Sequence, residues 1–168
     1  GAGEAIVHAA TEHPEHDFIG IEVYEAGLAR TMLNAAKAGL SNLRLIEANA
    51  PEVLEHFLPA ASVTEIRIFF PDPWHKARHN KRRLIQSRFT ELAANVLVPG
   101  GIVRMATDWE EYAEQMRDVF DHTESFRRAF DTDWADRFDG RPITSFERKG
   151  QLKGRVIRDL TYVFTPAS

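Results

Sequence analysis

Cysteine is absent from this chain of 168 residues, so disulfides, thiolate metal sites and a cysteine nucleophile are all excluded. Long apolar runs are missing too, since none approaches the roughly 18 residues that a membrane span needs. A formal net charge of −4 and a pI near 6.0 exclude a generic polyanion binder. No Gly-Lys-Ser/Thr phosphate loop occurs, which disfavours an NTPase. We expect a soluble, cytoplasmic protein that spans no membrane, holds no metal and contacts nucleic acid only locally.

Predicted helices and strands alternate along the chain, which is typical of a doubly wound, Rossmann-like α/β sheet that is mostly parallel. The composition, 43% hydrophobic, is enough for one core, so residues 1–168 are expected to form a single domain. Helices are predicted over 4–13, 26–38, 51–57, 84–97 and 109–122, strands over 17–23, 43–47, 63–70, 102–107 and 159–165, and irregular structure over 131–155.

The first residues, Gly1-Ala2-Gly3-Glu4, stand directly before an amphipathic helix. A Gly-x-Gly at such a place normally follows a strand. We therefore expect that N-terminal residues, including a central strand of the sheet, are missing ahead of Gly1. The two glycines allow close backbone approach to a ligand, and the helix N-terminus offers free N–H groups.

Four polar residues stand at or just past the ends of successive predicted strands: Glu22, Asn49, Asp72 and Asp108. Each could simply cap the following helix. In an open α/β sheet, however, the ligand crevice lies outside the carboxyl ends of the strands, so the set favours a bound cofactor. Glu22 follows Gly3 by nineteen residues, a spacing that suits an acid on ribose hydroxyls, and the Asn49 amide could read an adenine edge. A nucleoside cofactor without a large phosphate cradle suggests S-adenosylmethionine.

Asp72 is enclosed by Pro71 and Pro73, which remove two backbone donors and hold the segment stiff and extended. Such preorganisation favours a functional carboxylate over a simple turn. The acid-Pro-x-aromatic order resembles the Asp/Asn-Pro-Pro-aromatic run of amino-group methyltransferases. By that resemblance, Asp72 would accept hydrogen bonds from a nucleobase and Trp74 would stack on it.

A dense basic run follows Asp72 directly. Cations at a helix start oppose the helix dipole, so their placement favours binding of RNA phosphates over a merely solvated face. A second basic set within 148–158 indicates a loop that grips the substrate. The residues expected on the RNA backbone are Arg78, Lys81, Arg82 and Arg83.

The whole run from residue 71 to 84, PDPWHKARHNKRRL, closely resembles the signature of the bacterial tRNA (guanine-7-)-methyltransferases. Supporting matches to that family lie at 20–23, 106–109 and 144–147. The resemblance implies methyl transfer from S-adenosylmethionine to ring N7 of a guanine in the variable loop of tRNA. It also implies a Rossmann-like sheet with an antiparallel last strand.

The resemblance also assigns roles by position. Asp72 matches the catalytic acid, and Asn49 is a mild departure because the family often has Asp there. Whether Asp72 or Asp108 grips the guanine is left open. The cofactor positions are Gly1, Gly3, Glu22, Asn49 and Asp72, and the substrate positions are Lys76, Asp108, Thr144, Ser145, Phe146 and Glu147.

Other functions are weighed against this one. A methyltransferase acting on an exocyclic base amine in RNA or DNA fits the Asp-Pro-x-Trp run as well. A non-catalytic RNA-binding module of the same fold is a different class, disfavoured because Glu22, Asp72 and Asp108 are all present. A nicotinamide oxidoreductase is weakest, because no second substrate domain is expected. The protein is expected to be a monomer or a homodimer.

Overall fold

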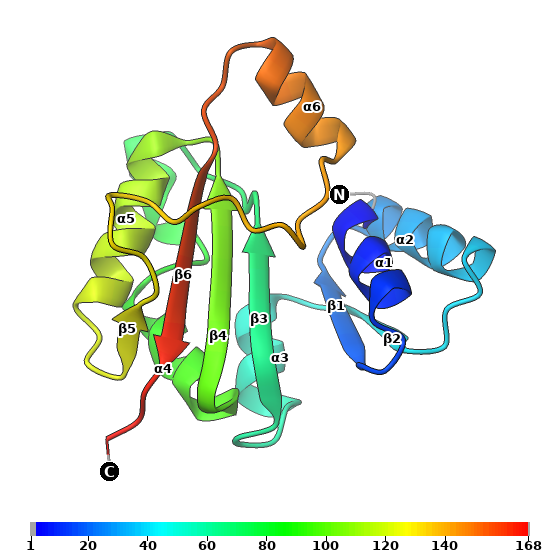
Figure 1. The fold of residues 1–168 in the computed structure, drawn as a ribbon, viewed down its shortest axis with the longest axis horizontal. Coiled ribbons are helices and arrows are strands. Elements are labelled where there is room, and N and C mark those ends of the chain that lie inside the picture. The colour runs from blue at the N-terminus through cyan, green and yellow to red at the C-terminus, as the bar shows by residue number, and fades with distance from the viewer. Residues whose placement is uncertain (1–2, 168) are drawn as a thin grey trace. The chain divides into compact units, whose positions relative to one another are not determined.

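The computed structural model describes residues 3–167, which divide into two compact units (Figure 1). The small unit comprises the chain up to Val53 together with Asp139–Lys149. The large unit comprises Leu54–Phe138 and the chain from Gly150 onward. Each unit has its own sheet, and each is described by itself below.

The small unit is built on a pair of parallel strands. Phe18 pairs with Leu43, and the register continues to Glu22 opposite Glu47. A Cβ at Gly20 would lie 2.9 Å from the Ile6 side chain, so a residue without a side chain lets the first helix pack closely on this strand. The elements are α1 (Glu4–Glu12), β1 (Phe18–Glu22), α2 (Glu25–Lys37), β2 (Leu43–Glu47) and α3 (Ala50–His56), which runs on into the large unit.

The large unit holds a four-stranded sheet in the order β3-β4-β6-β5. Strands β3 and β4 are parallel, whereas β6 is antiparallel to β4 and to β5. The elements are β3 (Val63–Phe69), the 3-10 helix η1 (Ala77–Arg82), α4 (Ser87–Val96), β4 (Leu97–Thr107), α5 (Glu110–Asp121), β5 (Phe126–Arg128) and β6 (Arg158–Phe164); α6 (Ser145–Leu152) begins in the small unit.

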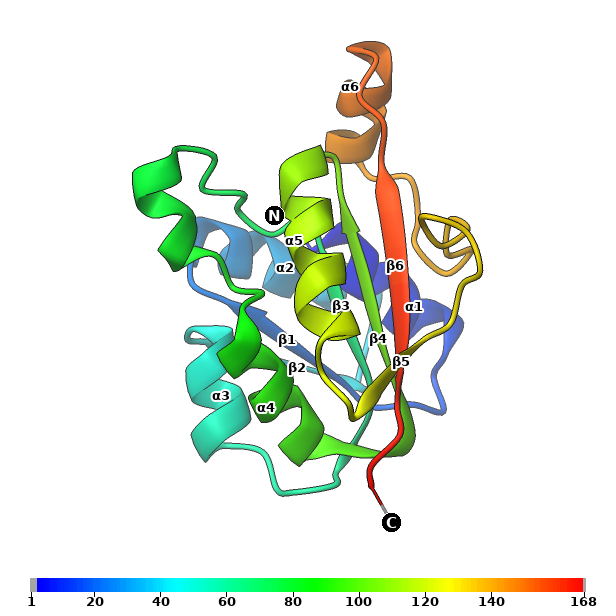
Figure 2. The same ribbon diagram turned by 90° about the vertical axis from the view of Figure 1, so that its left-hand side faces the viewer.

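Helices α4 and α5 cover one face of this sheet, and the segment after β5 crosses the other (Figure 2). Apolar residues of the two helices and of β4 and β6 form one buried cluster, which is the hydrophobic core of the large unit. On the other face, the ring of Phe138 lies 3.9 Å from the Arg104 guanidinium and 4.9 Å from that of Arg67. These cation–π contacts hold the segment after β5 against the face of the sheet opposite α4 and α5.

The α/β class and the antiparallel last strand are as expected. The pairing is mixed and not mostly parallel, because β1–β2 and β3–β4 pair in parallel whereas β4–β6 and β5–β6 pair antiparallel. The strands of the described residues form two sheets instead of the single sheet expected from the sequence. Within residues 3–167, no helix is both long and apolar enough to cross a membrane.

Three predicted boundaries differ from the structure. The helix expected from Leu84 begins at Ser87, because the Ile85 amide donates to the Tyr112 hydroxyl at 3.1 Å and so holds its segment in place. Strand β4 begins at Leu97 and not at 102, because Leu97 already pairs with Val63 before a register shift in β3. The segment 131–155, expected to be irregular, contains the whole of α6.

Tyr112 makes the stability of the large unit sensitive to alkaline pH. Burial raises the pKa of Tyr112 from 10.0 to about 12, so the unfolded chain releases this proton first as the pH rises. The contribution of Tyr112 to the free energy of unfolding should be constant below pH 10 and fall by about 1.4 kcal/mol per pH unit between pH 10 and pH 12. Denaturant titrations at several pH values measure it.

The variant Tyr112→Phe should lose stability less steeply over this range, with the remainder due to Tyr162, whose pKa burial also raises. Tyr24→Phe, at a position 62% exposed, is the matched control and should behave as the parent. An unchanged slope in Tyr112→Phe would contradict the assignment.

Candidate functional site

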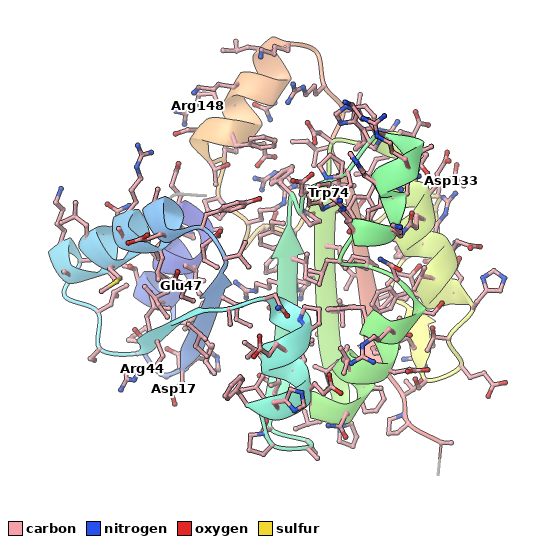
Figure 3. The ribbon with its side chains drawn as sticks, turned by 180° about the vertical axis from the view of Figure 1, so that it is seen from behind. Asp17, Arg44, Glu47, Trp74, Asp133 and Arg148 are labelled. Atoms are coloured by element: carbon pink, nitrogen blue, oxygen red, sulfur yellow. The ribbon has the colours of Figure 1, made fainter. Side chains whose placement is uncertain are left out.

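The carboxyl end of β3 turns sharply at two residues with positive φ. Phe70 has φ 56° and Trp74 has φ 42°, values that bulky residues rarely adopt. The Phe70 amide donates to the Ala106 carbonyl at 2.8 Å, which ties the first turn to β4. Backbone strain of this kind persists only where surrounding structure imposes it, and it clusters at functional sites. Asp72 lies between the two strained residues, and Figure 3 shows Trp74 at this end of β3.

Asp72 is exposed and held by a local hydrogen bond. The Trp74 amide donates to its Oδ1 at 3.0 Å, closing a tight turn across Pro73. Because Pro71 and Pro73 restrict the backbone on either side, the carboxylate is presented in a defined direction. The expectation of a stiff segment carrying a carboxylate therefore agrees with the observed geometry.

Arg83 does not face the RNA, and its assignment to the phosphate backbone is wrong. Its side chain is fully enclosed, with Nε donating to the Pro73 carbonyl at 2.6 Å and one terminal nitrogen to Gln115 Oε1 at 2.6 Å. The other terminal nitrogen pairs with the Glu111 carboxylate, and the guanidinium lies 4.7 Å from the centre of the Tyr112 ring. A charge this buried must be compensated, and these groups compensate it.

Sequence reasoning missed Glu111 and Gln115, the partners of Arg83. Their four-residue spacing puts them on one face of α5, which was the available signal. Only the packing of α5 shows that this face meets residue 83. The Arg83 guanidinium also holds the pKa of the Glu111 carboxyl below its usual range, chiefly by donating a hydrogen bond to it.

A basic surface remains around η1, made of four exposed side chains, Lys76, Arg78, Lys81 and Arg82. Trp74 is half-buried beside it, with the Arg82 guanidinium 5.2 Å from its ring centre. The ring of His79 meets Trp74 edge-on at 6.0 Å. Trp74 is thus already stacked by protein groups, which limits the face it can offer to a base.

Asp108 lies at the same edge of the sheet as Asp72, because β3 and β4 are parallel neighbours with Phe69 opposite Ala106. The rings of His75 and Trp109 are 5.4 Å apart and link the two segments.

Asp108 accepts a hydrogen bond from Arg155 at 3.1 Å, so part of the second basic set contacts this site. A shallow hollow of about 610 Å³ lies beside it, lined by Trp109 and four acidic residues, Asp108, Glu110, Glu111 and Glu114. Carboxylates accept hydrogen bonds and repel phosphates, so the hollow suits the N–H groups of a base.

In the small unit, Glu22 is the last residue of β1 and Asn49 follows the neighbouring parallel strand β2. The half-buried Glu22 accepts a hydrogen bond from the Tyr24 amide at 3.0 Å. Asn49 caps α3, since the Glu52 amide donates to its Oδ1 at 2.9 Å. Asn49 therefore has the helix-capping role that the sequence left open. Its side chain is also exposed at the carboxyl end of the two strands.

Gly3 has φ 74° and precedes α1. A Cβ there would lie only 2.2 Å from Thr31, so close packing against α2 requires a glycine at this position. Gly1, the other expected glycine of the cofactor loop, lies outside the described residues.

The predicted substrate segment begins α6. Thr144 caps the helix, since its hydroxyl accepts a hydrogen bond from the Glu147 amide at 3.2 Å. The Ser145 amide faces the carboxylate of Glu4 at 3.3 Å, which ties the segment to the start of α1. Phe146 is 48% exposed and accessible to a ligand.

Glu147 is buried and forms an ion pair with Arg141 at 2.5 Å, so its carboxylate supports the segment in this structure. Its role in binding the base stays a prediction.

Comparison with known proteins now adds independent information. Residues 1–160 match a family model described as "Putative methyltransferase". A "tRNA (guanine-N(7)-)-methyltransferase" of Sodalis glossinidius is 47% identical over 98% of this chain and 70% of its own length. A relative of the same name from Paenarthrobacter aurescens is 42% identical over 96% of this chain and 70% of its own length. Another, from Yersinia pestis, is 45% identical over 96% of this chain and 68% of its own length.

Solved structures show the same fold at low identity. The 16S rRNA methyltransferase KamB has a TM-score of 0.71 at 17% identity, covering 99% of this chain and 85% of that one. TrmN from Thermus thermophilus has a TM-score of 0.68 at 18% identity, covering 98% and 41%. These likenesses establish the Rossmann-like methyltransferase fold, and the sequence relatives establish the family. The chain belongs to the tRNA (guanine-N(7)-)-methyltransferases.

Proposed function

We propose that this chain transfers a methyl group from S-adenosylmethionine to N7 of a guanine in the variable loop of tRNA, with Asp72 as the catalytic carboxylate. The observation that carries the proposal is the fixed Asp72 turn at the carboxyl end of β3, directly beside the basic surface of η1. Family membership supports the activity and the methyl donor. The reaction would take place in the cytoplasm, where tRNA is found.

Methylation at N7 needs no general base, because this ring nitrogen carries a free lone pair. When bound, S-adenosylmethionine supplies a methyl group on a positively charged sulfur. Transfer of that methyl group to the N7 lone pair would leave the purine positively charged. A fixed carboxylate near the base stabilises that charge without having to reorient, so positioning and electrostatics are the main contributions of the protein.

We assign Asp72 to the side of the guanine that carries N7, and Asp108 to its base-pairing edge. That edge presents a ring N–H and an amino group, both donors, which a carboxylate can accept together. Arg155 already donates to Asp108, so the two would bind the base as one unit. Lys76 and the segment from Thr144 to Glu147 are assigned to the remaining substrate contacts.

The residues of the small unit fit the nucleoside part of the methyl donor. Glu22 offers a carboxylate to the ribose hydroxyls at the end of β1, and Asn49 offers an amide to the adenine after β2. Gly3 has no side chain of its own, and Thr31 of α2 packs against the backbone there, at the start of α1. We infer that residues 1–168 act as one catalytic domain, as a monomer or a homodimer.

Replacing Asp72 by Asn should lower kcat by roughly 10²–10³-fold while changing tRNA affinity only a few-fold. The amide keeps an oxygen for the Trp74 amide but removes the negative charge. Mass analysis of nucleosides from unmodified tRNA, incubated with S-adenosylmethionine and the protein, measures the 7-methylguanosine formed. A methylated exocyclic amine as product of the parent chain would contradict N7 transfer, and full activity of Asp72→Asn would contradict the role of the carboxylate.

Replacing Lys81 and Arg82 together by Ala should make the salt dependence of tRNA binding shallower. Each phosphate contact contributes about 0.7–0.9 to the slope of log K against log salt, so a decrease of about 1.5 is expected. Filter binding at several salt concentrations measures the slope. Arg127→Ala, also exposed but on β5, is the control and should leave it unchanged. An unchanged slope in the double variant would remove η1 from the interface.

Replacing Arg83 by Lys should lower kcat at least tenfold and leave the salt slope of tRNA binding unchanged. Lysine keeps the charge but cannot reach Pro73, Gln115 and Glu111 together, so the Asp72 turn loses its support. The variant Glu111→Gln keeps an acceptor for Arg83 and should show a smaller loss. A reduced salt slope in Arg83→Lys, with kcat intact, would instead restore the phosphate-binding assignment.

A further inference from the structure

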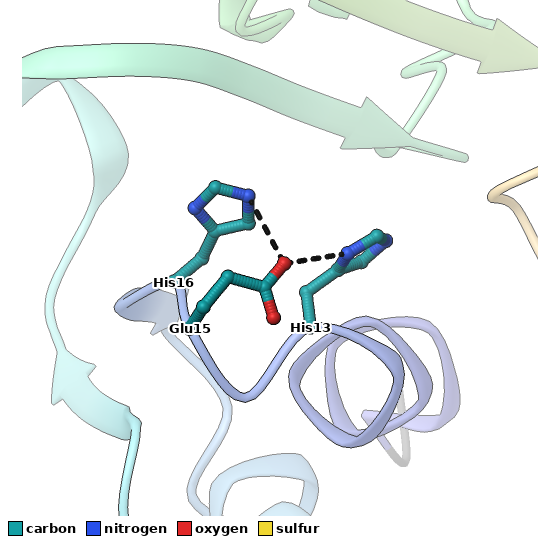
Figure 4. Close-up of side chains that lie close together, drawn as sticks. All are labelled: His13, Glu15 and His16. Atoms are coloured by element: carbon teal, nitrogen blue, oxygen red, sulfur yellow. Dashed lines mark hydrogen bonds and ion pairs between the residues drawn. The ribbon is translucent and has the colours of Figure 1, made fainter.

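A compact group of metal-binding side chains lies in the small unit, at the turn between α1 and β1. The group consists of His13, Glu15 and His16, whose ligand atoms all lie within 4.8 Å of one another (Figure 4). The turn precedes the first residue of β1, whereas Glu22 ends that strand. The group is therefore separated from the predicted cofactor residue by the length of β1 and is not used by the proposed reaction.

The spacing of these atoms matches a zinc site. His13 Nδ1 lies 3.2 Å and His16 Nε2 3.5 Å from the same oxygen, Glu15 Oε1. Two ligands placed about 2.0–2.1 Å from Zn²⁺ at the tetrahedral angle are separated by about 3.3 Å. Small rotations of the two exposed rings would bring all three atoms to bonding distance, with solvent completing the coordination.

The backbone that carries the three side chains is held in place. The His16 amide donates to the His13 carbonyl at 3.1 Å, a β-turn with Pro14 at its second position, where proline is favoured. The side-chain amide of Asn42 donates to the carbonyls of Ala10, His13 and His16 at 3.0, 3.1 and 2.9 Å. Because the turn is braced before any ion binds, less conformational entropy is lost on binding.

The charge of the group also suits a divalent cation. A glutamate carboxylate is ionised at neutral pH, so Glu15 supplies the negative charge and oxygen ligand beside two imidazole nitrogens. Imidazole nitrogens favour zinc and similar transition metals, whereas Mg²⁺ and Ca²⁺ prefer oxygen ligands.

We propose that His13, Glu15 and His16 bind one Zn²⁺ ion, which clamps the end of α1 to the start of β1. The ion adds stability to the small unit and takes no part in methyl transfer. The chain has seven histidines, so the test must separate this group from the other imidazoles.

Calorimetric titration of the whole chain with Zn²⁺ should show one strong site, and Zn²⁺ should raise the temperature of unfolding. His16→Gln and Glu15→Gln should each weaken the site at least tenfold and abolish the thermal shift. His122→Gln, at an exposed histidine that contacts Asp118, is the matched control and should retain both. Co²⁺ in place of Zn²⁺ should give the visible absorption of a nitrogen-ligated site in the parent and the control, and lose it in His16→Gln.

Equal Zn²⁺ affinity in the parent, His16→Gln and Glu15→Gln would overturn the proposal, as would the absence of any Zn²⁺-dependent thermal shift in the parent. Methyl transfer by His16→Gln should equal that of the parent when both are assayed without added zinc. A large loss of kcat in that variant, with its fold intact, would overturn the separation of this site from the reaction.

Discussion

The buried guanidinium of Arg83 is the interaction on which the candidate catalytic turn depends. It joins the Pro73 carbonyl, in a segment with no regular secondary structure, to Gln115 and Glu111 on α5. An enclosed charge that lost one of these partners would cost several kcal/mol, so the contacts resist being broken one at a time. The position of Asp72 is thereby coupled to the packing of α5 against the sheet.

That coupling explains how a strained segment can persist. Positive φ at Phe70 and Trp74 costs energy that local sequence does not recover. The Phe70 amide is held by Ala106 on β4, and Arg82 stacks on the Trp74 ring. The turn is thus restrained at both ends by contacts with other parts of the protein. The carboxylate of Asp72 between them is exposed and held in one orientation.

Cations serve two separate purposes in the large unit. Those of η1 are exposed, and their contact with phosphates stays a prediction. Others stack on aromatic rings of the protein itself. The Arg104 guanidinium lies 3.9 Å from the centre of the Phe138 ring, and the Arg117 guanidinium of α5 lies 4.3 Å from that of the Trp134 ring. A basic side chain near an active site therefore cannot be assigned to RNA from its sequence position alone.

Much of this protein could be predicted from its sequence. Alternating apolar segments predicted the α/β class, because that pattern depends on residues close together in the chain. The two prolines predicted a stiff, extended segment at Asp72, which in the structure is a tight turn closed by the Trp74 amide. The irregular segment 131–155 hid the helix α6, which local propensity alone did not reveal.

The role of Arg83 was decided by tertiary structure, since it depends on which face of α5 meets residue 83. Tertiary structure also decided the geometry of the proposed zinc site, because the distant Asn42 holds the turn between His13 and His16 in place. The sequence by itself determined which chemical groups are present and where strands end. Packing decided which of them are buried as supports and which remain at the surface to bind, because burial depends on contacts between distant segments.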